Sequence, residues 1–146
     1  MKYLLDTCVV SELIAKRPNQ TVLNWLDAQP QGDLYLTVIT IGEITRGICK
    51  LPDSKRKSAL ETWFSTDLLP RFSGRIMLIE VETMLLWGDL VGSLEPRGRV
   101  LSLMDSLIAA TALQGDFTLV TRNEKDFTGT GLTLFNPFDS RSGAVL

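Results

Sequence analysis

Residues 3–10 read Tyr3-Leu4-Leu5-Asp6-Thr7-Cys8-Val9-Val10, so a carboxylate directly follows a short apolar run. Further acids come just after the apolar runs of residues 36–41, 100–104 and 119–121: Glu43, Asp105 and Asp126. Short apolar runs of this kind are typical of buried strands. In an open α/β sheet, ligands bind beyond the carboxyl ends of the strands, near the point where the strand order reverses. The repetition therefore predicts that acids from distant segments meet in one pocket.

The sequence alternates between strand-like and helix-like segments. Apolar and β-branched character predicts strands over residues 3–5, 34–41, 75–80, 117–121 and 132–135. Apolar residues at helical spacing predict helices over residues 9–15, 21–28, 43–51, 55–69, 81–94 and 105–114. This alternation predicts an α/β fold with a mostly parallel central sheet of four to five strands flanked by helices.

The composition indicates a single globular domain. The chain has 146 residues, of which 45% are hydrophobic and 22% are charged, a balance typical of proteins that bury a core. The net charge of −2 gives no general attraction to nucleic acid, so a polyanionic partner requires a local basic patch. No apolar stretch approaches the length of a membrane span, and the first apolar run is too short for a signal peptide. We therefore expect no membrane partner and a cytoplasmic location.

The absence of histidine narrows the chemistry. It excludes a histidine general base and most zinc sites. The two cysteines, Cys8 and Cys49, form no metal-binding spacing and are expected to remain free thiols in a reducing compartment. Hydrolytic chemistry must then rely on carboxylates and a metal ion. Hard oxygen ligands favour Mg²⁺ or Mn²⁺ over zinc.

Each acid also has a simpler interpretation. Asp6 could cap a helix, and Glu43 or Asp105 could be first-turn acids favoured by the helix dipole. Asp126 could hold a turn. However, Asp6 and Asp105 interrupt apolar stretches, and a buried carboxylate is costly unless it is paired or bound to a metal. One cation shared by several acids is the simplest explanation of their coincidence.

Four segments resemble, in order and at similar intervals, the motifs of PIN-domain ribonucleases. They are Leu4-Leu5-Asp6-Thr7, Thr40-Ile41-Gly42-Glu43, residues 105–112 and residues 119–127. The resemblance is greatest to the VapC-type toxins of bacterial toxin–antitoxin pairs, including the FitB-like branch. It implies a PIN-like α/β/α sandwich over residues 1–138. Residues 139–146 have no apolar periodicity, and we expect them to form a flexible C-terminal tail.

The resemblance also implies roles for individual residues. The metal-ligating acids it implies are Asp6, Glu43 and Asp105. Either Asn123 is a neutral outer contact and Asp126 completes the catalytic set as a fourth acid, or the site has three acids. Two hydroxyl positions that orient the carboxylates or a water molecule are matched by Thr7 and Thr121. Such an enzyme uses Mg²⁺, or Mn²⁺, to cleave RNA with a metal-activated water, leaving 5′-phosphate and 3′-hydroxyl ends.

The resemblance implies several partners as well. These are an RNA substrate, a cognate VapB-type antitoxin and a second copy of the chain in a homodimer, with operator DNA bound only indirectly through the antitoxin. Arg46 and Arg122 are candidates for RNA contact, although for each one alone a solvated surface charge is the favoured interpretation. A groove between helix 55–69 and the helix near Trp25 could hold the antitoxin, and a buried core explains the same apolar pattern almost as well.

Other kinds of protein place acids at strand ends. A receiver-like signalling domain carries a phosphorylated Asp in an acidic Mg²⁺ pocket, but the segment Asp6-Thr7-Cys8 lacks its paired acids and Thr121-Arg122-Asn123 lacks its lysine. A nucleotide-binding domain requires a Gly-rich phosphate loop after a strand, which this sequence lacks. A catalytically inactive PIN fold used for binding is a further alternative, against which the intact set of three acids argues.

Overall fold

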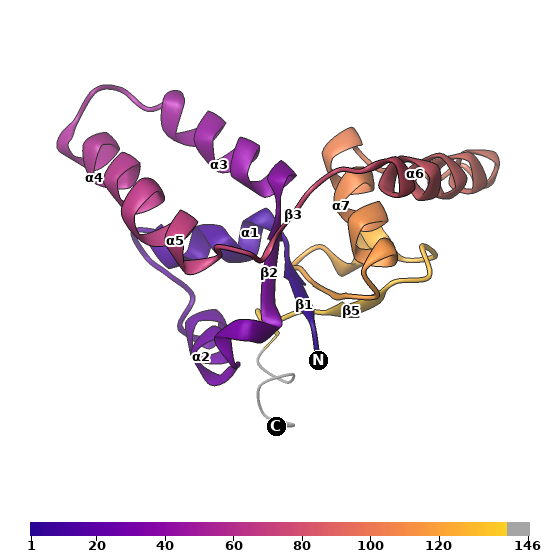
Figure 1. The fold of residues 1–146 in the computed structure, drawn as a ribbon, viewed down its shortest axis with the longest axis horizontal. Helices are drawn as coiled ribbons and strands as arrows, with labels where there is room; N and C mark the ends of the chain where they lie inside the picture. The colour runs from indigo at the N-terminus through magenta and orange to yellow at the C-terminus, as the bar shows by residue number, and fades with distance from the viewer. Residues whose placement is uncertain (140–146) are drawn as a thin grey trace.

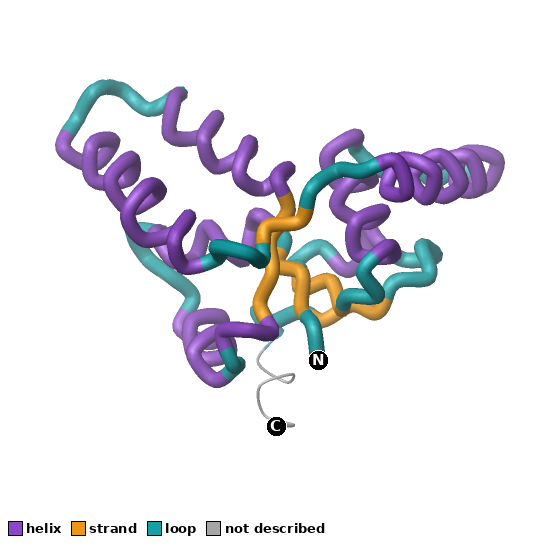
Figure 2. The backbone as a smooth tube through the Cα atoms, in the orientation of Figure 1, coloured by secondary structure: helices purple, strands orange, loops and turns teal. Residues whose placement is uncertain are grey.

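The computed structural model describes residues 1–139, with helices packed on both faces of one sheet (Figures 1 and 2). The strands are β1 (Tyr3–Leu5), β2 (Leu34–Thr37), β3 (Ile76–Met77), β4 (Thr118–Val120) and β5 (Thr133–Phe135). The α-helices are α1 (Thr7–Val10), α2 (Gln20–Ala28), α3 (Val38–Cys49), α4 (Lys55–Trp63), α5 (Leu69–Arg71), α6 (Val81–Leu94) and α7 (Leu103–Gln114). Short 3₁₀ segments are η1 (Ser11–Ile14), η2 (Gln31–Asp33), η4 (Glu95–Arg97) and η5 (Glu124–Phe127), and η3 (Phe64–Leu68) is a π-helical turn.

The strand order β3-β2-β1-β4-β5 places β1 at the centre of the sheet. Every pair of neighbouring strands is parallel, and Leu4 lies opposite Tyr35 on one side and Leu119 on the other. The chain runs from β1 to β2 and β3, and later returns to the other side of β1 to form β4 and β5. The strand order therefore reverses at β1, and Asp6 follows its carboxyl end, where sheets of this class bind ligands.

Alternate residues of the central strands face two separate cores. Leu5 and Val120 belong to the first core, with apolar residues of α1, α2, α3 and α4. Leu4 and Leu119 belong to the second core, with residues of α6 and α7. All four of these side chains are fully buried. Figure 1 shows α1 to α5 on one side of the strands and α6 and α7 on the other, so the predicted α/β/α sandwich with a parallel sheet is confirmed.

The expected strand over residues 34–41 is too long. The strand β2 ends at Thr37, and α3 begins at Val38. The hydroxyl of Thr37 accepts a hydrogen bond from the amide of Thr40 at 3.1 Å, which is an N-terminal cap. Ile44 and Ile48 of α3 are buried in the first core. Burial of this helical face and the cap outweigh the strand preference of the β-branched residues, because that preference depends strongly on context.

Two other expected segments differ from the structure. The apolar run of residues 100–104 is not a strand: Val100 is 87% exposed, and α7 begins at Leu103 with Ser102 as its cap. The strand expected over residues 75–80 is reduced to Ile76–Met77. Glu43 and Asp105 therefore stand on helices rather than at the ends of strands, and the prediction of a strand before each acid was wrong for these two.

The remaining predictions concern the ends and surfaces of the chain. Among the described residues, no helix is both long and apolar enough to cross a membrane. Cys8 and Cys49 are free cysteines, as predicted. Of the tail expected over residues 139–146, residues 140–146 lie outside the described part of the chain.

Candidate active site

Asp6 lies at the carboxyl end of β1 and is only 5% exposed. Its amide donates to the carbonyl of Val120 at 2.9 Å, which ties it to β4. Its Oδ1 accepts a hydrogen bond from the amide of Thr7 at 2.8 Å. Its Oδ2 accepts from the hydroxyl of Thr121 at 2.8 Å and from the thiol of Cys8 at 3.8 Å. The side chain is thereby held in one orientation, and an ionised carboxylate still has lone pairs for a further ligand.

Thr121 follows β4 and is fully buried. Its hydroxyl donates to Asp6 and accepts a hydrogen bond from the amide of Asn123 at 3.0 Å. As donor to Asp6 and as acceptor from Asn123, this hydroxyl connects the loop after β4 with the end of β1. Asn123 thus contacts the site through its backbone.

Glu43 is connected to the end of β1 through Thr7. The hydroxyl of Thr7 donates to Oε1 of Glu43 at 2.6 Å and lies 2.9 Å from the hydroxyl of Thr40. Since Thr7 follows Asp6 directly, these hydrogen bonds connect a carboxylate of α3 to the segment that follows β1. Glu43 itself is partly exposed.

Asp105 is partly buried in the first turn of α7. Its amide donates to the hydroxyl of Ser102 at 3.2 Å. The negative charges of Asp105 and Glu43 both raise the pKa of Asp6. Those of Glu43 and Asp126 raise the pKa of Asp105. The three acids Asp6, Glu43 and Asp105 therefore lie within electrostatic reach of one another. Asp126 is exposed in η5, and its charge reaches Asp105.

The electrostatics of the site disfavour ionised carboxylates. Burial raises the pKa of Asp6 above its ordinary value of 3.8, and the charges of Asp105 and Glu43 add to this effect, while hydrogen bonds from Thr121 and Thr7 oppose it. Burial also raises the pKa of Asp105; the hydrogen bond with Ser102 opposes the rise, and the charges of Glu43 and Asp126 add to it. Dehydration and repulsion between like charges are the two penalties that a bound cation relieves.

The donor set suits a hard divalent cation. It consists of carboxylate oxygens from three segments, without imidazole, and such ligands favour Mg²⁺ or Mn²⁺. Within residues 1–139, no three His, Cys, Asp or Glu side chains are grouped so that they could hold a metal ion. The acids would have to draw closer together to share one. The residues therefore fit a cation in chemistry and charge, and metal ligation by them stays a prediction.

The sequence matches the PIN domain model over residues 3–131. This chain belongs to the PIN-domain family. It is 34% identical to VapC ribonuclease Y4jK of Sinorhizobium fredii, over 93% of this chain and 97% of that protein. It is 33% identical to Toxin FitB of Neisseria gonorrhoeae, over 92% of this chain and 97% of that protein.

A solved structure confirms the fold of this PIN domain. The crystal structure of FitAcB from Neisseria gonorrhoeae matches with a TM-score of 0.89 at 33% identity, covering 93% of this chain and 98% of the other. The predicted resemblance to VapC-type toxins, including the FitB-like branch, is therefore confirmed. Membership in this family excludes the receiver-like signalling domain and the nucleotide-binding domain as interpretations of the fold.

The two arginines predicted to contact RNA have different surroundings in this PIN domain. Arg46 is exposed on α3 and lines a cavity of about 190 Å³ together with Glu43 and Met104. The guanidinium of Arg122 lies 3.4 Å from a carboxylate oxygen of Glu12 and 3.9 Å from the centre of the Phe138 ring. Arg46 thus borders the acidic site, and Arg122 already has two partners within the chain.

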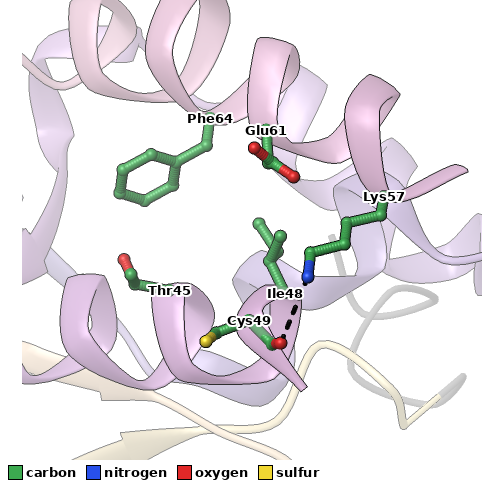
Figure 3. A pocket seen from close by; sticks show the side chains of 6 residues that line it. All are labelled: Thr45, Ile48, Cys49, Lys57, Glu61 and Phe64. Atoms are coloured by element: carbon green, nitrogen blue, oxygen red, sulfur yellow. Dashed lines mark hydrogen bonds between the residues drawn. The ribbon is translucent and has the colours of Figure 1, made fainter. Parts of the chain in front are cut away.

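The residue Trp25, beside which a groove was expected, belongs to the first core. Trp25 is 7% exposed and packs against Tyr3 and Phe135, with ring centres 5.0 Å apart in each pair. A cavity of about 300 Å³ instead lies between α3 and α4 (Figure 3). It is lined by Thr45, Ile48, Cys49, Lys57, Glu61 and Phe64.

Sequence reasoning missed three residues around this PIN-domain site. Thr40 lay in a run expected to be a strand, although Thr37 three residues before it is a residue type favoured at a helix N-cap. Glu12 and Phe138, the partners of Arg122, are more than 100 positions apart from each other, and no local pattern in a single sequence connects them.

Proposed function

We propose that this chain is a metal-dependent endoribonuclease that acts as the toxin of a toxin–antitoxin pair. One arrangement carries the proposal: at the switch point of the sheet, Thr7 joins Asp6, which follows β1, to Glu43 of α3, and Asp105 of α7 lies within electrostatic reach, in a chain of the PIN-domain family. The relatives named a VapC ribonuclease and a toxin support the activity and its biological role.

In this proposal, Asp6, Glu43 and Asp105 hold Mg²⁺, or Mn²⁺ in its place. When bound, such a cation supplies Lewis acidity at the scissile phosphate and promotes the ionisation of a water molecule. The residues of the chain bind the cation and orient the carboxylates that hold it. The Thr7 amide and the Thr121 hydroxyl fix the carboxylate of Asp6, and the Thr7 hydroxyl fixes that of Glu43.

We assign the fourth catalytic position to Asp126 rather than to Asn123. The charge of Asp126 acts on Asp105, so this acid contributes to the same negative field. The hydrogen bond of Asn123 to Thr121 comes from its backbone amide, which any residue except proline could supply. An Asn123→Ala chain should therefore keep more activity than an Asp126→Asn chain.

Arg46 is the better candidate for contact with an RNA phosphate. It borders the cavity that Glu43 lines, and a guanidinium binds phosphate through paired N–H groups. Arg122 would have to leave Glu12 to bind RNA, at a small cost because its side chain is 55% exposed. We therefore propose a direct phosphate contact for Arg46 and a secondary one for Arg122.

Cleavage of RNA by the purified chain tests the proposed function. The Asp6→Asn and Asp105→Asn chains are compared with the wild type in Mg²⁺, in Mn²⁺ and with EDTA. Asp27→Asn, an exposed acid on α2, is the matched control, because α2 lies at the end of the sheet near the N-terminus (Figure 1). Loss of cation-dependent cleavage in both site variants, but not in the control, supports the proposal. Undiminished cleavage by both site variants overturns it.

We further propose that a VapB-type antitoxin binds this chain and that operator DNA is contacted through the antitoxin. Support comes from the similar FitAcB crystal structure and from a structure of FitAB bound to an IR36 DNA fragment. The matched protein chain of the second structure is 33% identical to this one, with a TM-score of 0.90. The cavity between α3 and α4 offers an apolar surface to such a partner, with Phe64 and Ile48 on its walls (Figure 3). Co-purification with the product of the adjacent reading frame tests this partner.

The proposed assembly also includes a second copy of the chain. Four large apolar side chains around the start of α6 are exposed: Leu78, Val81, Met84 and Leu85. Exposed apolar clusters of this kind are favoured at interfaces between subunits. Since the proposed substrate is cellular RNA, we place the action of the protein in the cytoplasm.

A further inference from the structure

Two threonine hydroxyls and a carboxylate form a continuous chain of hydrogen bonds beside the acidic site. The hydroxyl of Thr40 lies 2.9 Å from that of Thr7, and the Thr7 hydroxyl donates to Oε1 of Glu43 at 2.6 Å. Thr40 is fully buried, whereas Glu43 is partly exposed. This series of hydrogen bonds therefore runs from the interior of the protein to Glu43, the side chain proposed to bind the cation.

The direction of this chain follows from the number of available protons. A hydroxyl has one proton, and the proton of Thr7 is used in the bond to Glu43, whose ionised carboxylate can only accept. In the contact between the two hydroxyls, Thr40 must therefore be the donor and Thr7 the acceptor. A hydroxyl that accepts a hydrogen bond becomes a stronger donor in the next one.

The backbone around Thr40 fixes the origin of the chain. The amide of Thr40 donates to the hydroxyl of Thr37 at 3.1 Å, so Thr40 belongs to the capped first turn of α3. Thr7 is fixed in turn, because its amide donates to Asp6 at 2.8 Å. The two hydroxyls in contact thus belong to helices α3 and α1, and burial decreases from the fully buried Thr40 to the partly exposed Thr7 and Glu43.

We propose that Thr40 is a positioning residue for Glu43, acting through the hydroxyl of Thr7. This inference rests on the proposed function and assigns to Thr40 the orientation of one carboxylate. Groups that hydrogen-bond to metal ligands restrict their orientation, and their loss typically reduces metal affinity or activity by about 10–100-fold. Thr40 touches neither substrate nor cation in this role.

The decisive variant is Thr40→Val, which removes the hydroxyl and keeps the shape of the side chain. We expect it to weaken Mn²⁺ binding, measured by electron paramagnetic resonance on the purified chain, by about 10-fold or more. We expect kcat for RNA cleavage to fall by a similar factor with little change in KM. Thr40→Ser, which restores the hydroxyl, should recover both quantities to within about threefold of the wild type.

The matched control is Thr111→Val. Thr111 is also a buried threonine on a helix, 1% exposed, and its hydroxyl donates to the carbonyl of Leu107 at 2.9 Å. Loss of this hydroxyl should lower the Tm as the loss of any buried hydrogen bond does, without weakening Mn²⁺ binding. A Thr111→Val chain that loses as much Mn²⁺ affinity as Thr40→Val would overturn the inference, because a general structural effect would then explain both.

A second comparison isolates the path through Glu43. In a Glu43→Ala background, Thr40→Val should cause no further loss of Mn²⁺ affinity, because the residue that Thr40 positions is gone. An equal loss in both backgrounds would overturn the inference. So would a Thr40→Ser chain as impaired as Thr40→Val, or a Thr40→Val chain with Mn²⁺ affinity equal to that of the wild type.

The two proposals can fail separately. If the wild type binds Mn²⁺ and Thr40→Val weakens that binding, the positioning role is supported even when no RNA is cleaved, and only the proposed activity is overturned. If the wild type cleaves RNA with a cation and Thr40→Val changes neither binding nor kcat, the activity is supported and the positioning role is overturned.

Discussion

Replacing Asp6 by asparagine is expected to stabilise the fold in EDTA and to remove its response to divalent cations. The carboxylate is 5% exposed, and its pKa is raised by burial first and by the charges of Asp105 and Glu43 after it. The pKa of Asp6 is raised even though hydrogen bonds from Thr121 and Thr7 lower it. The ionised group is therefore a net cost to the fold without a cation, and asparagine removes the charge while keeping a similar shape.

The magnitude follows from linkage. Each unit by which the folded-state pKa exceeds the unfolded-state value costs about 1.4 kcal/mol when the pH is above both values. For a chain of 146 residues, about 1.4 kcal/mol corresponds to a shift in Tm of roughly 3–6 °C. We therefore expect Asp6→Asn to melt above the wild type at pH 7 in EDTA, because the pKa of Asp6 is raised in the folded state.

The sign of the pH dependence is also fixed. The destabilisation is fully present above the raised folded-state pKa of Asp6 and disappears as the pH falls through that pKa towards the ordinary value of 3.8. The difference in Tm between Asp6→Asn and the wild type should therefore shrink as the pH is lowered.

Thermal melts monitored by circular dichroism, with EDTA, Mg²⁺ or Mn²⁺, measure these quantities. The wild type should gain about 2.7 kcal/mol at a cation concentration 100 times the Kd, and Asp6→Asn should gain much less. Asp27→Asn, exposed on α2, should behave as the wild type to within about 0.5 kcal/mol. An Asp6→Asn chain that melts below the wild type in EDTA, or keeps the full response to Mg²⁺, would contradict this prediction.

Three further predictions concern the surroundings of the site. Thr121→Val removes the hydroxyl that donates to Asp6 at 2.8 Å, and we expect calorimetry to show Mn²⁺ affinity about 10–100-fold weaker; an unchanged affinity would count against this role. Ser102→Ala removes the cap of α7 and the hydrogen bond that lowers the pKa of Asp105. It should cost about 1 kcal/mol of stability and move the pH midpoint of Mn²⁺ binding upward, and a downward shift would contradict the assigned sign. Leu85→Glu places a charge at a side chain that is 66% exposed on α6, and light scattering should show a lower mass if this surface joins two copies; an unchanged dimer would exclude it.

The elements that sequence reasoning predicted well are those in which local and tertiary preferences agree. The strand over residues 3–5 was predicted with its observed bounds, as was the helix Val81–Leu94. Helix α2 starts one residue before the expected Thr21, and Asn19 caps it through the amide of Val22 at 3.2 Å. In each case the apolar pattern matches the face that the fold buries, so a single sequence is sufficient.

The errors arise where a hydroxyl decides between strand and helix. Residues 38–41 are all β-branched, which favours a strand. The Thr37 cap and the burial of one face of α3 nevertheless make them helical. Ser102 does the same for the apolar run before Asp105. The acids were predicted as a set because their residue type is visible in the sequence. The hydroxyl of Thr40 was missed because its contact with Thr7 spans 33 positions and exists only once α3 is packed against α1.

The most direct test of the central idea is a crystal structure of the wild-type chain grown with Mn²⁺, with the ion located by its anomalous scattering. The account predicts one or more peaks between Asp6, Glu43 and Asp105, with a carboxylate oxygen of each at about 2.1 Å, drawn closer together than in the structure described above. A peak elsewhere on the molecule, or none beside Asp6 at Mn²⁺ concentrations that support RNA cleavage, would contradict it.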